Sequence, residues 1–152
     1  MEPVLILGAT SDIGIALAHK FAQEKYPVQL AARNIEKLQS HRNDLIVRYN
    51  VKITTHKFDV TETNSHKEFI DSLSNFPLVV VCVVGLMGEQ RYNENDQRKS
   101  SIVMRTNYEG PANILSEFAN LFEQKKSGTI IGISSVAGDR GRASNYIYGS
   151  SK

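Results

Sequence analysis

Three side chains near the end of the chain have the types and spacing needed for acid–base chemistry: the hydroxyl of Ser135, the phenol of Tyr148 and the amine of Lys152. Tyr148 and Lys152 are four residues apart, so a helix would place both side chains on one face, one turn from each other. A free tyrosine titrates near pH ~10, and a neighbouring ammonium lowers the pKa of the phenol because it favours the phenolate. We therefore expect Tyr148 to transfer a proton at neutral pH, with Ser135 at the end of a strand nearby.

The elements that would position these groups can be read from the apolar pattern, which alternates between strand and helix. Short apolar or alternating runs predict five strands, over residues 4–7, 28–32, 51–58, 78–84 and 129–134. Between them, helical periodicity predicts helices from residue 12 to before the proline at 27, over 35–49, from a threonine cap at 61 or 63 to about 73, and over about 100–124. These elements predict a single α/β domain over residues 1–152, with a doubly wound, Rossmann-like parallel sheet.

Local signals mark the ends of the last two helices. Pro111 predicts a kink or break of the long helix at Gly110, and Gly128 is expected to end that helix. Either Ser144 or Asn145 is expected to cap a final helix, which would carry the tyrosine and the lysine.

The first strand ends in a glycine-containing loop, residues 8–14, that runs into the first helix. Glycines let such a loop turn sharply and approach a pyrophosphate, whose charge is met by the N–H groups at the start of the helix. We therefore expect a dinucleotide here, with contacts from Gly8, Thr10, Ser11, Ile13 and Gly14. A tight strand–helix turn that binds nothing is the alternative.

Arg33 stands at the end of the second strand, where proteins of this architecture distinguish between cofactors. A carboxylate at this place binds the ribose 2′-hydroxyl of NAD, whereas an arginine accommodates the 2′-phosphate of NADP. The next acid along the chain is Glu36, so we expect Arg33 to contact the phosphate and NADPH to be preferred over NADH. A solvated surface arginine is the alternative.

The catalytic pattern resembles the short-chain dehydrogenase/reductase family, since Ser135 precedes Tyr148-x-x-x-Lys152 by thirteen residues and lies in an Ile-Ser-Ser-x-Ala-Gly strand end. The resemblance implies an oxidoreductase that transfers hydride between the nicotinamide of NADP(H) and a small-molecule carbonyl or secondary alcohol. It also implies that Tyr148 protonates the developing alkoxide and that Ser135 hydrogen-bonds the same oxygen. Lys152 would bind the nicotinamide ribose and lower the pKa of the tyrosine.

Four more residues match family motifs to different degrees. Asp59 and Val60 resemble the family's Asp-Val after the third strand, which implies that Asp59 contacts the adenine ring and Val60 flanks it; a helix cap is the alternative for Asp59. Gly85 is kept from the family's Asn-Asn-Ala-Gly, which implies that the backbone approaches the cofactor there. Asn107 resembles the family's helical asparagine, which implies that it anchors a water in a proton relay to Lys152; a polar surface residue is the alternative.

Two departures from the family pattern concern the cofactor side. Asp12 replaces a glycine of the loop, and we expect it to point outward and cap the first helix, because a carboxylate inside the loop would repel a pyrophosphate. Cys82, Val83 and Val84 replace the family's Asn-Asn-Ala, so the side-chain hydrogen bonds of those amides are missing. The departures favour a non-catalytic dinucleotide-binding domain as an alternative, whereas the complete catalytic set favours an enzyme.

Composition excludes several other classes of protein. The chain has 152 residues, 41% hydrophobic and 22% charged, and its net charge of +2 includes no basic run that would indicate nucleic-acid binding. The longest apolar run, residues 78–84, is too short to span a membrane. Cys82 is the single cysteine, which fits a reducing, cytoplasmic setting, and the four histidines show no ligand spacing, so no metal is expected.

The chain stops about one turn into its expected last helix, whereas the resemblance implies that family domains continue with the rest of that helix and two more strands. We therefore expect a domain truncated at its C-terminus, and an inactive fragment of a reductase is a further alternative. An exposed sheet edge and helix face would favour homo-oligomers. The identity of the carbonyl substrate is not readable, because the segment expected to select it follows the final residue.

Overall fold

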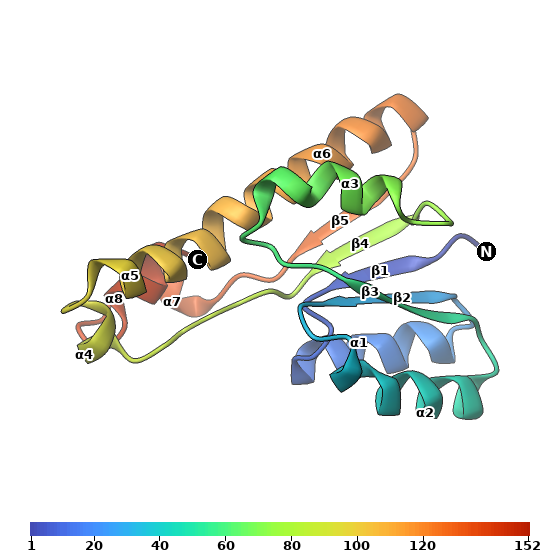
Figure 1. Ribbon diagram of the computed structural model, residues 1–152, viewed down its shortest axis with the longest axis horizontal. Helices are drawn as coiled ribbons and strands as arrows, with labels where there is room; N and C mark the ends of the chain where they lie inside the picture. The colour runs from blue at the N-terminus through green and yellow to red at the C-terminus, as the bar shows by residue number, and fades with distance from the viewer.

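Five short strands pair in parallel to form one sheet in a computed structural model that describes residues 1–152 (Figure 1). The strands are β1 (Val4–Leu7), β2 (Val28–Ala32), β3 (Ile53–Lys57), β4 (Val79–Cys82) and β5 (Thr129–Gly132). Their order is β3-β2-β1-β4-β5, and Val4 of β1 aligns with Val28 of β2 and Val79 of β4. The chain turns back past β1 to add β4 on its other side, so this is the doubly wound, Rossmann-like sheet predicted from the sequence.

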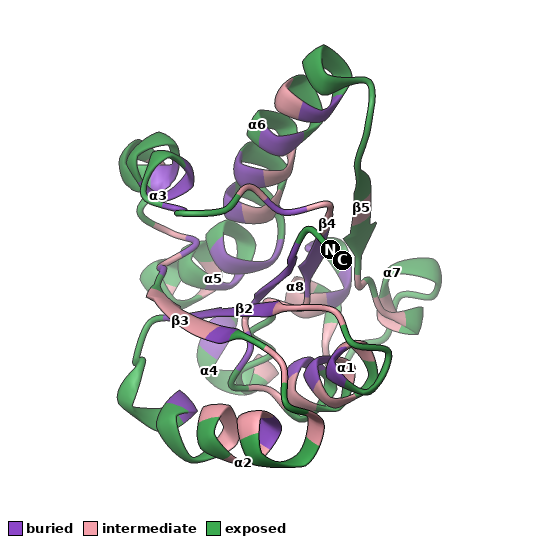
Figure 2. Cartoon of the chain, turned by 90° about the vertical axis from the view of Figure 1, so that its right-hand side faces the viewer, coloured by how far each residue is buried: buried purple, intermediate pink, exposed green.

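Helices cover both faces of the sheet, as a buried parallel sheet requires (Figure 1). On one face lie α1 (Asp12–Gln23) and α2 (Gln39–Tyr49), and on the other α3 (His66–Asp71) and α6 (Gly110–Lys125). Successive side chains of β1 point to opposite faces, so Val4 and Ile6 belong to the core beneath α1 and α2. Leu5 and Leu7 belong to the core beneath α3 and α6. Figure 2 shows the buried parts of the helices turned toward the sheet.

Shorter helical segments connect these elements. They are η1 (Glu36–Leu38), η2 (Thr63–Ser65), α4 (Gln90–Asn93), α5 (Gln97–Met104), η3 (Arg105–Glu109), α7 (Val136–Asp139) and α8 (Tyr146–Ser150). The segments η1 and η2 are 3-10 turns, whereas η3 is a π-helical turn. The helices α4, α5, α7 and α8 gather beyond the carboxyl ends of the strands (Figure 1). No helix combines the length and the apolar character needed to cross a membrane.

The long helix predicted over about 100–124 is present as α5, η3 and α6 in direct succession. The π-helical turn η3 lies immediately before Gly110, where a break was predicted, and Pro111 supplies no N–H for a regular helical bond. Gly110 also faces the carbonyl of Val60 so closely that a Cβ would overlap it. The prediction that Gly128 ends the helix is wrong, because Lys126 adopts the left-handed conformation (φ 55°) that terminates α6.

Several other predicted boundaries also differ from the structure. The helix predicted over 35–49 is present as η1 followed by α2 and begins one residue later, at Glu36, while β3 begins at Ile53, two residues later than predicted. The threonine cap predicted at 61 or 63 is wrong, since Glu62 takes the cap position of η2. β5 ends at Gly132, so Ser135 follows the strand after two intervening residues rather than ending it.

Candidate active site

A cavity of about 220 Å³ opens at the carboxyl ends of β1 to β4, the edge where doubly wound sheets bind ligands. Seven of the nine residues predicted to bind the cofactor line it: Gly8, Thr10, Ser11, Arg33, Asp59, Val60 and Gly85. Ile13 and Gly14 do not. The Ile13 side chain is 53% exposed on α1, and Gly14 is buried where a Cβ would lie 2.9 Å from the Cα of Ala9.

The glycine loop is shaped by one left-handed residue and one side-chain cap. Gly8 has φ 87°, a conformation that favours glycine. A side chain would also be crowded at this position, because a Cβ would lie 3.0 Å from the backbone nitrogen of Val84. Ser11 caps α1: its Oγ accepts from the Gly14 N–H (3.1 Å) and donates to the Gly8 carbonyl (3.0 Å). The predicted cap, Asp12, makes no capping bond. Its side chain is exposed in the first turn of α1, where the negative charge interacts favourably with the helix dipole.

The far wall of the cavity is built by the turn after β3. Asp59 accepts hydrogen bonds from the Thr61 backbone N–H (3.0 Å) and the Thr61 hydroxyl (2.8 Å), so it stabilises a local turn and caps no helix. His66 on α3 donates through Nε2 to the Val60 carbonyl (3.1 Å), since a carbonyl can only accept. Burial lowers the pKa of His66. Arg33 directly follows β2, the strand that pairs with β3, and is exposed where it lines the same cavity.

Three of the predicted catalytic residues, Ser135, Tyr148 and Lys152, lie on or directly beside two short helices that pack together, α7 and α8, beyond the carboxyl ends of β4 and β5 (Figure 1). Ser135 caps α7, with its Oγ accepting from the Ala137 N–H at 3.2 Å. Lys152 lies two residues beyond α8, not on the helix as predicted, yet its Nζ is 6.0 Å from the centre of the Tyr148 ring. The same Nζ donates to the carbonyls of Val84 (3.2 Å) and Ile133 (3.3 Å).

Asn107, in the π-helical turn η3, is buried rather than a surface residue, with 7% of its surface exposed. Its Oδ1 accepts from the Leu86 N–H (2.7 Å), while its Nδ2 donates to the Leu86 carbonyl (2.8 Å) and to Ser151 Oγ (2.9 Å). Ser151 Oγ in turn donates to the carbonyl of Tyr148 at 2.7 Å. One side chain thus connects η3, the loop after β4 and α8.

Leu86 and Ser151 are site residues that sequence reasoning missed. Leu86 takes part through its backbone, and its bonds to Asn107 cross 21 residues, so no local pattern signals them. Ser151 is 1% exposed, and its position directly before Lys152 was the only available hint.

A second cavity, of about 190 Å³, lies behind the lysine, between β4, β5 and α6. Its polar side chains are those of Asn107, Ser134 and Lys152, and Cys82 also lines it. Burial raises the pKa of the Cys82 thiol, so this cysteine stays protonated at neutral pH and is no nucleophile.

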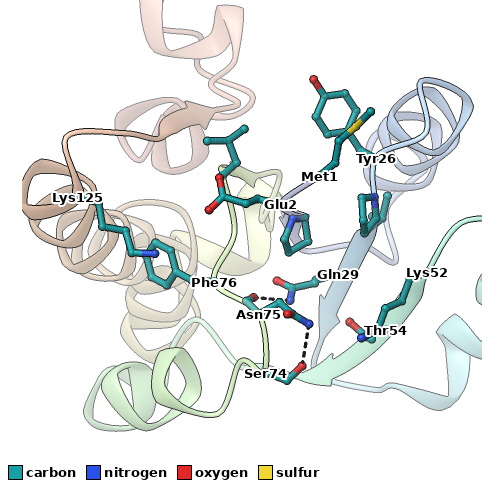
Figure 3. A pocket seen from close by; sticks show the side chains of 14 residues that line it. Met1, Glu2, Tyr26, Gln29, Lys52, Thr54, Ser74, Asn75, Phe76 and Lys125 are labelled. Atoms are coloured by element: carbon teal, nitrogen blue, oxygen red, sulfur yellow. Dashed lines mark hydrogen bonds between the residues drawn. The ribbon is translucent and has the colours of Figure 1, made fainter.

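The largest cavity, about 930 Å³, lies at the opposite end of the sheet, at the amino ends of the strands (Figure 3). Gln29 lies in the middle of it, with Tyr26 and Met1 on one side and Phe76 with Lys125 on the other. None of the predicted site residues lines it, and doubly wound sheets bind their ligands at the carboxyl ends. The 220 Å³ cavity at the carboxyl ends of the strands is therefore the candidate site.

The chain belongs to the short-chain dehydrogenase family, since the family model of that description matches residues 2–152. An uncharacterized oxidoreductase of Mycobacterium tuberculosis is 32% identical over 153 residues, which cover 99% of this chain and 61% of the relative. An NADPH-dependent pterin aldehyde reductase of Arabidopsis thaliana is 31% identical over 153 residues, which cover 98% of this chain and 62% of the relative. The chain thus spans about three-fifths of the length of these relatives.

Solved structures share the fold over nearly the whole chain. An actinorhodin polyketide ketoreductase variant with NADPH superposes with a TM-score of 0.87 at 23% identity, covering 99% of this chain and 59% of that one. An NAD+-bound xylitol dehydrogenase superposes with a TM-score of 0.88 at 23% identity, with the same coverage of both chains. At this level of identity the likeness establishes the Rossmann-like fold.

Proposed function

We propose that the chain forms the cofactor-binding and catalytic portion of an NADP(H)-dependent oxidoreductase that interconverts a carbonyl and a secondary alcohol. The observation that carries the proposal is the convergence of Gly8, Arg33, Asp59 and Gly85 on one cavity at the carboxyl ends of the strands. A bound nicotinamide cofactor supplies or accepts the hydride. Side chains of this chain would supply or accept the proton that accompanies the hydride.

The residues around the cavity fit a dinucleotide. A Cβ at Gly85 would lie 3.4 Å from Lys152 Nζ and 3.8 Å from Asn107 Oδ1, so its absence keeps the space before the lysine open. Gly8 and the start of α1 would hold the pyrophosphate. Asp59 and Val60 would contact the adenine from the opposite wall, and Arg33 would meet the 2′-phosphate.

Proton transfer is assigned to Tyr148, which would protonate the substrate oxygen in reduction and accept the proton in oxidation. Ser135 would donate a hydrogen bond to the same oxygen. An ammonium has three hydrogens, and two of those on Lys152 are directed at the Val84 and Ile133 carbonyls, which leaves one for a ribose hydroxyl. The cavity behind the lysine would hold the relay water, bound by the remaining Oδ1 lone pair of Asn107.

The cofactor preference is tested at Arg33. Among the proteins compared, one reductase is NADPH-dependent by name and one dehydrogenase is NAD+-bound, so the choice depends on this chain's own residues. We expect NADPH to bind more tightly than NADH, and Arg33→Ala to weaken NADPH binding roughly tenfold or more while NADH binding stays unchanged, because a hydrogen bond between charged groups is lost. Titration of both reduced cofactors by fluorescence measures this.

Lys37→Ala is the matched control, because Lys37 is an exposed cation four residues further on that does not line the cavity. Its affinities for both cofactors should equal those of the wild type. Tighter binding of NADH than NADPH by the wild type, or an Arg33→Ala variant with unchanged NADPH affinity, contradicts the assignment.

A non-catalytic dinucleotide-binding role is the second candidate, favoured by Val83 and Val84 in the cavity wall, whose side chains carry no hydrogen-bonding groups. It predicts cofactor binding without turnover.

We also propose that the protein forms homo-oligomers, since β5 is an edge strand that pairs with β4 alone and exposes 36% of Ile131. Light scattering on the purified protein tests this; a monomer at micromolar concentration contradicts it.

A further inference from the structure

The first turn of α8, the helix that carries Tyr148, has an unusual cap. Asn145 takes the cap position, and its carbonyl accepts the Gly149 N–H at 2.8 Å. Its side chain makes no capping bond, however, and its Oδ1 is buried without a partner. A helix start normally has such an oxygen bonded to the N–H of the second or third residue.

The missing acceptor comes from a different helix. The N–H of Ile147, the second residue of α8, donates at 3.2 Å to the Oε1 of Gln90, the first residue of α4. Gln90 and Ile147 are separated by 57 residues, so this cap is a tertiary contact. Ile147 directly precedes Tyr148, and α8 is only five residues long, too short to be stable by itself.

A second contact joins α4 to the same turn. Glu94 accepts through Oε2 from Gln90 Nε2 (3.2 Å) and from the Tyr146 hydroxyl (3.4 Å). The amide of Gln90 is thereby oriented with its nitrogen toward the carboxylate and its oxygen toward Ile147. Both residues before Tyr148 are thus held by α4.

The loop that leads into α4 also forms a wall of the candidate cofactor cavity. Val83, Val84, Gly85 and Leu86 line that cavity, and Gln90 follows four residues after Leu86. Leu86 is held by Asn107 through both of its backbone groups. The segment is therefore anchored beside the cavity at one end and on α8 at the other.

We propose that Gln90 is a positioning residue for Tyr148: it caps α8 from outside and sets the orientation of the phenol relative to the cofactor cavity. The proposal rests on the proposed function, because Tyr148 is the proton donor there. Without the Oε1 acceptor, the Ile147 N–H is left without a partner and the first turn of α8 opens more often. Misplacement of a catalytic group reduces the rate of the chemical step more than it weakens binding.

The test compares Gln90→Leu with the wild type in the purified protein that carries this chain. Amide hydrogen exchange of Ile147 and Tyr148, followed by NMR, should speed up about fivefold, as expected for the loss of a helix cap. Turnover with NADPH should show kcat reduced by about tenfold, with the dissociation constant of NADPH within about twofold of the wild type.

Two further variants separate positioning from general damage. The double variant Gln90→Glu, Glu94→Gln exchanges the two groups, so position 90 keeps an oxygen for the Ile147 N–H and position 94 supplies the donor between them. It should restore both the exchange rate and kcat to near the wild-type values. Gln97→Leu makes the same change on α5 at an exposed glutamine and should alter neither.

Unchanged exchange at Ile147 in Gln90→Leu overturns the proposal, and so does faster exchange accompanied by an unchanged kcat. A double variant no better than Gln90→Leu overturns it as well. Failure of the proposed function is a separate result: the wild type would then bind NADPH without turning over any carbonyl, while the exchange measurement would still report whether Gln90 caps α8.

Discussion

Around the candidate site, single polar side chains bind backbone groups of neighbouring elements, in two cases across 21 and 57 residues of sequence. Asn107 binds Leu86, and Gln90 binds Ile147. His66 binds the carbonyl of Val60 in the cavity wall and is itself 2% exposed. A change in one of these side chains would leave the backbone group that it binds without a partner, so its effect would reach the site through that backbone.

We expect His66 to make the stability of the fold dependent on pH. Burial lowers its pKa, while hydrogen bonding to the backbone of Val60 and the nearby carboxylates of Glu117 and Asp59 act in the opposite direction to a smaller extent. The unfolded chain therefore binds a proton at a higher pH than the folded chain does. The free energy of unfolding should be fully retained above the ordinary histidine pKa of about 6.5 and should fall as the pH decreases from there toward the folded-state pKa.

Thermal unfolding from pH 7.5 to 5 measures this effect. The variant His66→Gln keeps a hydrogen-bond donor but does not titrate, so its melting temperature should decline less over this range than that of the wild type. Some decline should remain, because burial also lowers the pKa of His56. Parallel curves for the two proteins would show that His66 does not contribute.

At the scale of elements, the glycine loop between β1 and α1 is where we propose that the backbone approaches the cofactor. Gly8→Ala introduces a Cβ at φ 87°, in a place only 3.0 Å from the Val84 backbone nitrogen. We expect a loss of about 1–3 kcal/mol in the free energy of unfolding, because the left-handed conformation is strained for alanine. NADPH affinity should fall by at least about tenfold, since the backbone around position 8 must shift.

Gly132→Ala is the matched control for that experiment. Gly132 ends β5 and has no positive φ. A Cβ added there would have no atom within 4 Å. Denaturant unfolding and cofactor titration should find this variant close to the wild type. Equal effects of the two substitutions would mean that the loop geometry at Gly8 has no special role.

Much of the element pattern could be predicted from the sequence, because it depends on burial. β1 and β2 have the predicted bounds, since both consist of residues buried on the two faces of the sheet. Helix ends were harder to predict. Ser11 caps α1 in place of Asp12, and Lys126 ends α6 in place of Gly128, because neighbouring residues can supply the same local bond.

The candidate site likewise has one part that could be predicted from the sequence and another that could not. Gly8, Arg33 and Gly85 follow strands, and the carboxyl ends of parallel strands meet at one edge, so their shared cavity follows from the order of elements. The contacts of Gln90 and Ser151 could not be predicted, because they cross 57 and 44 residues and depend on how the short helices pack.

At the scale of the whole molecule, one parallel sheet separates two helical layers and carries all the candidate chemistry at its carboxyl edge (Figure 1). The candidate cofactor cavity lies at the carboxyl ends of β1 to β4, and Lys152 lies between the ends of β4 and β5. Under the proposed function, Lys152 links the two parts of the site, since its Nζ lies 6.0 Å from the centre of the Tyr148 ring and donates to the carbonyl of Val84, which lines the cavity. Reversible hydride transfer to a carbonyl requires a proton donor close to the bound cofactor.

The central claim is that Tyr148 supplies the proton for a reaction driven by bound NADPH. It is tested by following NADPH oxidation with a panel of aldehydes and ketones, in the wild type, in Tyr148→Phe and in Tyr108→Phe. Tyr108→Phe is the control, because Tyr108 is 66% exposed and lines neither cavity of the site. We expect Tyr148→Phe to bind NADPH like the wild type and to lose turnover by a factor of about 10² or more. Turnover by Tyr148→Phe at the wild-type rate would contradict the account.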